Sequence, residues 1–218
     1  TIYSVNAAWG DDPTSFFIDS FLQVVPGDTF SWAPAWSVMI PLALVWILVL
    51  FVIGRGLSKG VEAANKIFLP LLVILFLALV VRALFLPGAV EGLNAFFTPN
   101  WGALVDPKVW LAAFAQIFYS LSVGFGIMLT YASYLQRKSN LTGTALVAGF
   151  ANSSFEILAG IGVFSAVGFM AHQGGVSVSE VEGLTGPILS FVTFPKIISM
   201  MPGGPLFGVL FFSSLVLA

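Results

Sequence analysis

The 218-residue chain is 58% hydrophobic and only 8% charged, with eight Lys and Arg against ten Asp and Glu. Soluble domains carry about 25% charged residues, so this composition indicates a helical membrane protein that crosses the bilayer several times. The absence of cysteine excludes disulfides and thiol chemistry, the single histidine argues against a histidine metal site, and the net charge of −2 gives no reason to expect nucleic acid as a partner.

The first 35 residues are typical of a loop, because they hold four aspartates, no Lys or Arg, and the turn-forming pairs Asp12-Pro13 and Pro26-Gly27. The aromatic side chains of the segment 16–22 predict a short amphipathic helix at the membrane surface within this loop. The chain starts without methionine and ends inside an apolar run, so we expect a fragment of a longer protein.

Long apolar segments follow in order, separated by polar or proline-containing stretches. They predict membrane helices over 36–53, 67–86, 109–135 and 144–171, and the start of another over 204–218. Between them lie a short basic loop (54–66), a proline-containing loop (87–108), a basic turn (136–143) and a long loop (172–203). Within the last of these, the apolar stretch 187–201 suggests a short pair of helices divided at Pro195.

The basic residues predict the orientation of the chain in the membrane. Five of the eight fall within 54–66 and 136–138, and cytoplasmic loops carry the excess of Lys and Arg. We therefore expect the loops 54–66 and 136–143 to be cytoplasmic and residues 1–35, 87–108 and 172–203 to lie outside.

The segment 109–135 is polar at its centre, which is the reverse of an ordinary membrane helix. Residues 116–126 read QIFYSLSVGFG and place Gln116, Ser120 and Ser122 in mid-span. Non-helical backbone survives at this depth only where protein buries it or a cavity hydrates it. We interpret the stretch as a discontinuous helix whose break forms a binding site near the bilayer midplane; a continuous helix with small residues for close packing is the alternative.

Such a break would offer sites for both an anion and a cation. A half-helix starting near residues 123–125 would point free N–H groups at a carboxylate, and the unwound carbonyls of Tyr119 and Ser120 would suit a cation. The pair suggests an amino-acid zwitterion bound with Na⁺. Tyr119 and Phe125 would either wall the side-chain pocket or face lipid and other helices.

Glu156 is the only acidic residue well inside a predicted span, with Asn152 one helical turn before it. An intramembrane carboxylate is a functional hypothesis by default because its charge is costly in hydrocarbon. Together with Ser120, Ser122 and Gln116 it supplies oxygen donors for Na⁺ or a proton relay. The alternative is a buried structural hydrogen-bond network with a protonated Glu156.

Gly60 and Pro70 frame nine residues at the start of the second span. Proline removes a helical hydrogen bond, so the pair predicts a helix end that unwinds and admits water. A plain helix start with proline in its first turn is the alternative.

These motifs together resemble the neurotransmitter:sodium symporters, and most closely their bacterial leucine-transporter branch. The stretch 116–126, followed by LTYASY at 129–134, resembles helix 6 of that family; residues 56–62 are similar to its intracellular loop between helices 4 and 5, and the interval from Gly60 to Pro70 to its Gly-X9-Pro motif in helix 5. The resemblance covers nearly the whole chain and is weakest before residue 36.

The resemblance implies an all-α membrane protein that is part of the inverted-repeat leucine-transporter fold, with a discontinuous helix 6. The chain would be one transmembrane domain comprising extracellular loop 2 (1–35), helix 4 (36–53), helix 5 (67–86), broken helix 6 (109–135), helix 7 (144–171), extracellular loop 4 (172–203) and the start of helix 8 (204–218). Helices 1–3 and 9–12 would be supplied by the rest of the same protein.

The resemblance also implies roles for individual residues. The residues implied for the substrate pocket are Tyr119, Ser120, Ser122 and Phe125. The first sodium site would take Ser120 and Asn152, and the second would take the backbone carbonyl of Ala218. Tyr134 would belong to the intracellular gate. Where chloride-dependent members have serine, this chain has Glu156, whose charge would replace the anion beside Gln116 and Ser120 and could cycle protons in antiport.

The implied function is sodium-coupled symport of an amino acid or related small amine across the cytoplasmic membrane, independent of chloride. Na⁺ would be the co-transported ion, the bilayer the surrounding partner, and no organic cofactor is expected. An ion channel or a non-transporting sensor on the same fold is the alternative. An intramembrane hydrolase built on Ser120 or Ser122 with Glu156 lacks a His or Lys base within the spans, so we do not expect an enzyme.

Overall fold

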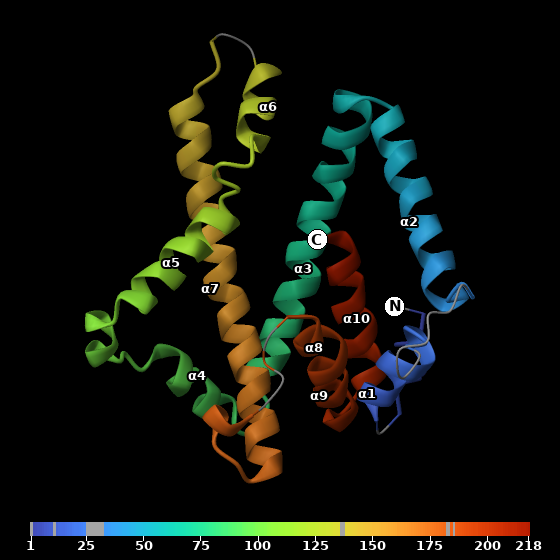
Figure 1. The fold of residues 1–218 in the computed structure, drawn as a ribbon, viewed down its shortest axis with the longest axis vertical. Helices are drawn as coiled ribbons and strands as arrows, with labels where there is room; N and C mark the ends of the chain where they lie inside the picture. The colour runs from blue at the N-terminus through green and yellow to red at the C-terminus, as the bar shows by residue number, and fades with distance from the viewer. Residues whose placement is uncertain (1, 11, 25–32, 136–137, 182–183, 185) are drawn as a thin grey trace.

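The computed structural model describes residues 2–10, 12–24, 33–135, 138–181, 184 and 186–218 (Figure 1). In this part of the chain every regular element is helical, in agreement with the expected all-α fold. Three helices in it are long and apolar enough to cross a membrane: α2 (Trp36–Gly54), α3 (Ala63–Leu84, extended by the preceding turn) and α7 (Leu141–Gly174).

The helices α2 and α3 form a hairpin whose connection is shorter than the expected loop 54–66. A π-helical turn, η2 (Leu57–Glu62), leads directly into α3. A Cβ atom on Gly60 would lie 2.0 Å from the carbonyl oxygen of Val52 in α2, so only glycine permits this close return of the chain. Pro70 lies in the interior of α3, which contradicts the alternative that it occupies the first turn.

The stretch after α3, expected as a loop, contains a helix that sequence analysis missed. This helix, α4 (Ala89–Phe97), packs along α7, and a 3₁₀ turn, η3 (Trp101–Val105), follows it. A Cβ atom on Gly92 would lie 1.8 Å from the carbonyl oxygen of Phe164 in α7. The two backbones therefore nearly touch, and this packing, more than propensity, holds so short a helix.

The broken helix consists of α5 (Pro107–Ser120) and α6 (Ile127–Ser133), within two residues of the expected 109–135. The next helix, α7, is longer than the expected 144–171 at both ends. Asn140 caps its start by accepting a hydrogen bond from the Gly143 amide at 2.9 Å, and Gly175, with φ +65°, ends it.

The region 172–203, expected as a long loop with a short helix pair over 187–201, is mostly helical in its described residues. A 3₁₀ turn η4 (Val178–Glu180) precedes α8 (Gly186–Ile188), the π-helical η5 (Leu189–Thr193) and α9 (Phe194–Met200). The expected division at Pro195 is wrong, because the helix runs on past this residue. The widened π turn, in which the Phe194 amide donates to Leu189, lies just before the proline and accommodates its missing N–H.

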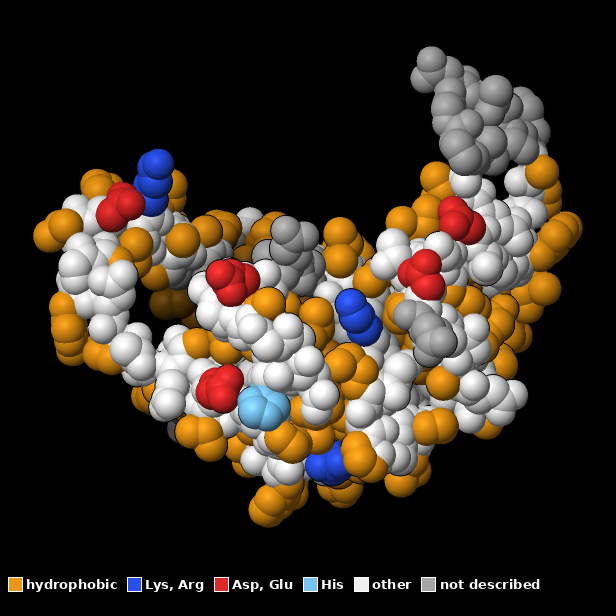
Figure 2. Space-filling view, turned by 90° about the horizontal axis from the view of Figure 1, so that it is seen from below, with side chains coloured by type: hydrophobic (Ala, Val, Ile, Leu, Met, Phe, Trp, Pro, Cys, Tyr) orange, Lys and Arg blue, Asp and Glu red, His pale blue; other side chains and the backbone are white. Residues whose placement is uncertain are grey.

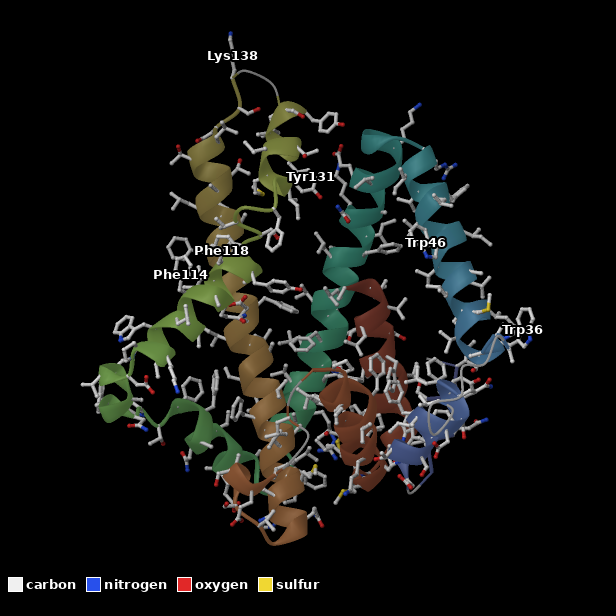
Figure 3. The ribbon with its side chains drawn as sticks, in the orientation of Figure 1. Trp36, Trp46, Phe114, Phe118, Tyr131 and Lys138 are labelled. Carbon is white, nitrogen blue, oxygen red and sulfur yellow. The ribbon has the colours of Figure 1, made fainter. Side chains whose placement is uncertain are left out.

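The last helix, α10 (Gly204–Leu217), packs on α3 and α9. Buried apolar side chains gather where α3, α7, α9 and α10 meet, and we call this region, at the Gly174 end of α7, the packed end. The opposite, open end holds the α2–α3 turn and α6, and there the hairpin and the broken helix spread apart (Figure 1). Helix α2 has no buried residue, and Trp36 at its start projects away from α3 (Figure 3).

Charged side chains lie singly over the face of the packed end, among apolar and neutral ones (Figure 2). His172 Nδ1 of α7 lies 3.5 Å from Glu91 Oε1 of α4, so an ion pair can form there when the imidazole is protonated. Both side chains are about half exposed, and such pairs contribute little to stability.

Candidate functional site

The break between α5 and α6 is built from residues in left-handed backbone conformations. Ser122, Gly124 and Gly126 have φ of +53°, +81° and +75°. Repeated positive φ values cannot continue a right-handed helix, and glycine adopts them with little cost. Helix α6 therefore starts at Ile127, later than the expected 123–125. The discontinuous helix itself is confirmed.

Some of the N–H groups in the unwound segment form hydrogen bonds to backbone carbonyls at the end of α5. The Ser122 amide donates to the Tyr119 carbonyl, and the Val123 amide donates to the Phe118 carbonyl, both at 3.0 Å. A carbonyl oxygen has two lone pairs, so the Tyr119 oxygen keeps one acceptor position for a cation. The Phe118 ring lies under the break, since a Cβ atom on Gly124 would come within 2.8 Å of it.

The last residue of α5 meets the middle of α7 in a three-residue polar network. The Ser120 hydroxyl donates to Glu156 Oε1 and accepts from Asn152 Nδ2. Asn152 Nδ2 also lies 3.1 Å from the same carboxylate oxygen. The structure thus brings Ser120 together with Asn152 and Glu156, which follow it by 32 and 36 residues in the sequence.

Aromatic packing between α3 and α7 supports the rotation of α7 that directs Glu156 toward α5. The rings of Phe76 in α3 and Phe155 in α7 have centroids 5.0 Å apart. Because successive helical residues point about 100° apart, a Phe155 ring packed on α3 leaves Glu156 directed elsewhere, toward α5. Phe114 and Phe118 lie along α5 near its crossing with α7 (Figure 3).

The network supplies oxygen atoms without a basic partner. In the part of the chain that the structure describes, no Lys or Arg forms an ion pair with Glu156, and Asn152 Oδ1 accepts no hydrogen bond. Hydroxyl, amide and carboxylate oxygens are ligands that hard cations accept. A negative, oxygen-lined cluster beside an unwound backbone can therefore hold an alkali cation.

Other predicted site residues are not joined to this network. Gln116 is exposed and makes no hydrogen bond to Glu156 within the described ranges. Tyr119 and Phe125 pack edge to face, with ring centroids 6.3 Å apart, and their side chains are 74% and 58% exposed. Ala218 follows the end of α10.

Two motifs that the sequence presented separately face one groove at the open end. A cavity of about 810 Å³ lies between the start of α3 and α6, lined by Glu62, Lys66, Pro70, Tyr131 and Tyr134 among others. Tyr131 of α6 lies on the side toward α3 (Figure 3). Tyr134, expected at the intracellular gate, thus lies across this groove from the segment between Gly60 and Pro70. No sequence pattern connected the two.

Apolar membrane helices, a helix broken at mid-span and a polar network at the break define a membrane transporter with a discontinuous helix. Such helices are a known feature of secondary transporters, and the bacterial leucine transporters resembled above are among the established cases. The break in this chain therefore agrees with a known architecture and is not a new one.

The chain belongs to the sodium:neurotransmitter symporter family, whose model matches residues 3–218. It is 41% identical over 210 residues to an uncharacterized sodium-dependent transporter of Methanocaldococcus jannaschii, covering 95% of the chain and 42% of that protein. It is 35% identical over 205 residues to the sodium- and chloride-dependent creatine transporter 1 of Bos taurus, covering 93% of the chain and 32% of that protein.

The crystal structure of MhsT in complex with L-phenylalanine matches with a TM-score of 0.68 and 35% identity, over 99% of the chain and 48% of MhsT. The chain therefore spans less than half the length of these relatives. The match extends the leucine-transporter-like fold to nearly every residue. Because the family and these relatives are transporters, the hydrolase alternative is set aside.

Proposed function

We propose that the protein containing this chain transports an amino acid or related small amine by sodium-coupled symport that does not require chloride. The observation that carries the proposal is the network of Ser120, Asn152 and Glu156 beside the break. Ser120 and Asn152 would be ligands of one sodium ion, and the Glu156 carboxylate would provide the negative charge that an anion otherwise supplies.

The substrate would bind at the break, against the exposed rings of Tyr119 and Phe125 and the hydroxyls of Ser120 and Ser122. The carbonyls of the unwound backbone suit the ammonium group of an amine. The family supports this class, since the solved relative is bound to L-phenylalanine and another relative is named for creatine. The Ala218 carbonyl would serve a second sodium ion with residues outside this chain.

The orientation follows from the charges and their placement. The α2–α3 turn, with Arg55 and Lys59, and Lys138 after α6 lie at the same, open end (Figures 1 and 3). By the positive-inside rule this end would face the cytoplasm. The groove between Tyr134 and the start of α3 would then open to the cytoplasm, where release of substrate requires water to enter.

Uptake by the full-length parent protein in proteoliposomes tests the proposal. A radiolabelled amino-acid mixture is offered under an inward Na⁺ gradient, with chloride or with gluconate. We expect Na⁺-driven uptake that is equal in both anions. Glu156→Ser should make uptake depend on chloride, because the site then lacks its fixed negative charge.

Glu91→Ser is the matched control, since it removes a half-exposed carboxylate at the packed end. This variant should remain indifferent to chloride. Wild-type uptake that already needs chloride would contradict the role of Glu156 and leave symport standing. Conductance without saturation would favour a channel, and the absence of any Na⁺-dependent uptake would contradict the transport proposal.

A further inference from the structure

The packed end holds a partly open apolar cavity that is separate from the polar network. Its volume is about 220 Å³, and it lies between α3, α7, α9 and α10. Its walls include Phe76, Val80, Ala166, Ile197, Phe207 and Phe211. Ser120, Asn152 and Glu156 do not line it.

The inner wall of the cavity belongs to the best-packed part of the described chain. Val80, Ala166, Ile197 and Phe211 are each at most 9% exposed. The inner wall of the cavity is therefore part of the core, while half-buried side chains such as Leu79 and Phe207, with the exposed Leu215, form its open side. Interiors normally fill such space, since a lining atom that faces a void loses its dispersion contacts.

Water is a poor occupant of this cavity. A buried water needs two to four polar partners, and Ser190 contributes the one polar side chain among the lining residues. An apolar cavity of about 150 Å³ in another protein stays dry and binds benzene. The present cavity is larger and has four phenylalanine rings in its walls.

We propose that this cavity is a binding site for an uncharged hydrocarbon group. A small alkylbenzene or the end of a lipid acyl chain would supply the same chemistry, because either would fill the void with apolar atoms and bring no polar group that needs a partner. Aromatic walls favour a ring or a chain that can lie against their faces.

Photolabelling of the full-length transporter in nanodiscs tests this site directly. The probe is 3-(trifluoromethyl)-3-phenyldiazirine, a compact apolar aromatic compound, and the labelled residues are mapped by mass spectrometry. We expect saturable labelling of residues in α9 and α10 that line the cavity. Ethylbenzene at about ten times its Kd should reduce this labelling to about one tenth, as simple competition requires.

A second competitor separates the two sources of hydrocarbon. Lysophosphatidylcholine that displaces the label would identify an acyl chain as an occupant, whereas displacement by ethylbenzene alone would identify a small aromatic molecule. Both results support the site. Labelling of the cavity residues that neither competitor reduces, or that rises linearly with probe as on the exposed α2, would overturn the proposal.

Cavity-filling variants provide the matched comparison. Ala166→Leu places extra methyl groups in the cavity from a buried position, and Ala159→Leu does so from a half-buried lining position that tolerates a larger side chain more readily. Either variant that folds should lose the saturable labelling. Ala145→Leu makes the same change on an exposed face of α7 and should keep it. Unchanged labelling in a folded filling variant would contradict the assignment.

Discussion

The contact between α4 and α7 can be tested by adding one methyl group at Gly168. A Cβ atom there would lie 2.4 Å from the carbonyl oxygen of Gly88, 2.6 Å from the Gly92 nitrogen and 2.9 Å from its Cα. All three are backbone atoms, so no side chain can rotate away. Reaching ordinary contact at 3.4 Å requires α4 to move outward by about 1 Å.

Overpacking of this kind costs about 1–3 kcal/mol. Replacing glycine by alanine inside a helix returns about 0.5–1 kcal/mol, so we expect Gly168→Ala to lower the free energy of unfolding by up to about 2.5 kcal/mol. In the full-length transporter this corresponds to a fall in Tm of a few degrees. Thermal unfolding followed by size-exclusion chromatography measures the shift.

Gly174→Ala is the control on the same helix. A Cβ atom at this position would meet Val176 Cγ2 at 3.6 Å, which is ordinary contact. The variant should therefore keep or slightly raise the Tm. Equal Tm values for the two variants would refute the inferred close approach of α4 and α7.

Two further predictions concern the break and the turn before α8. Ser122→Gly should raise the unfolding free energy by up to about 1 kcal/mol, because the left-handed conformation costs a side-chain-bearing residue about 1–2 kcal/mol and glycine entropy returns only part of that cost; a Tm equal to that of Ser122→Ala would contradict it. The Ser177 amide donates to Glu180 Oε2 at 2.9 Å, and this bond holds the pKa of Glu180 below its ordinary value of 4.5. Its contribution to stability is complete above the ordinary pKa and disappears as pH falls through the lowered one. Ser177→Pro removes the backbone N–H donor, whereas Ser177→Ala keeps this donor, so the proline variant should raise the pKa of Glu180 further than the alanine variant. A ¹³C NMR titration of the Glu180 carboxyl measures the pKa in both variants. Equal pKa values would exclude the backbone hydrogen bond as the main cause of the lowered pKa.

The discontinuous helix could be predicted from sequence because its signal is local. Serine and glycine residues at the centre of an apolar segment are inconsistent with a simple lipid-facing helix, whatever surrounds it. The starting residue of α6 could not be predicted, because it depends on which positions turn left-handed. Ser122 is such a position. Its residue type does not distinguish it from Ser120, which is also a serine but ends α5 as a helical residue.

Helix α4 was missed because its stability comes from α7. Pro87-Gly88 before it and Pro99 after it are signals of a loop. The helix forms in spite of them because Gly88 and Gly92 allow its backbone to lie against α7. Contacts of this kind join residues about 76 positions apart and leave no periodic pattern in either segment.

The polar network was predicted as a set of residues, and its geometry was only partly foreseen. Asn152 and Glu156 are one turn apart on α7, so their proximity follows from helical spacing alone. Their contact with Ser120 depends on how α5 crosses α7. The same crossing leaves Gln116, one turn before Ser120, exposed, although sequence reasoning placed it beside the carboxylate.

The network joins the end of α5, at the break, to the continuous helix α7. Ser120 is the last residue before the break, while Asn152 and Glu156 are fixed on α7, which runs without interruption for 34 residues and so for about 50 Å. A change in the angle between α5 and α7 would move Ser120 relative to the other two residues. The sodium ion proposed to bind Ser120 and Asn152 would then favour one angle between α5 and α7, and a ligand with such a preference stabilises the conformation that it prefers. The concentration of that ion would shift the conformational equilibrium between different angles of α5 and α7.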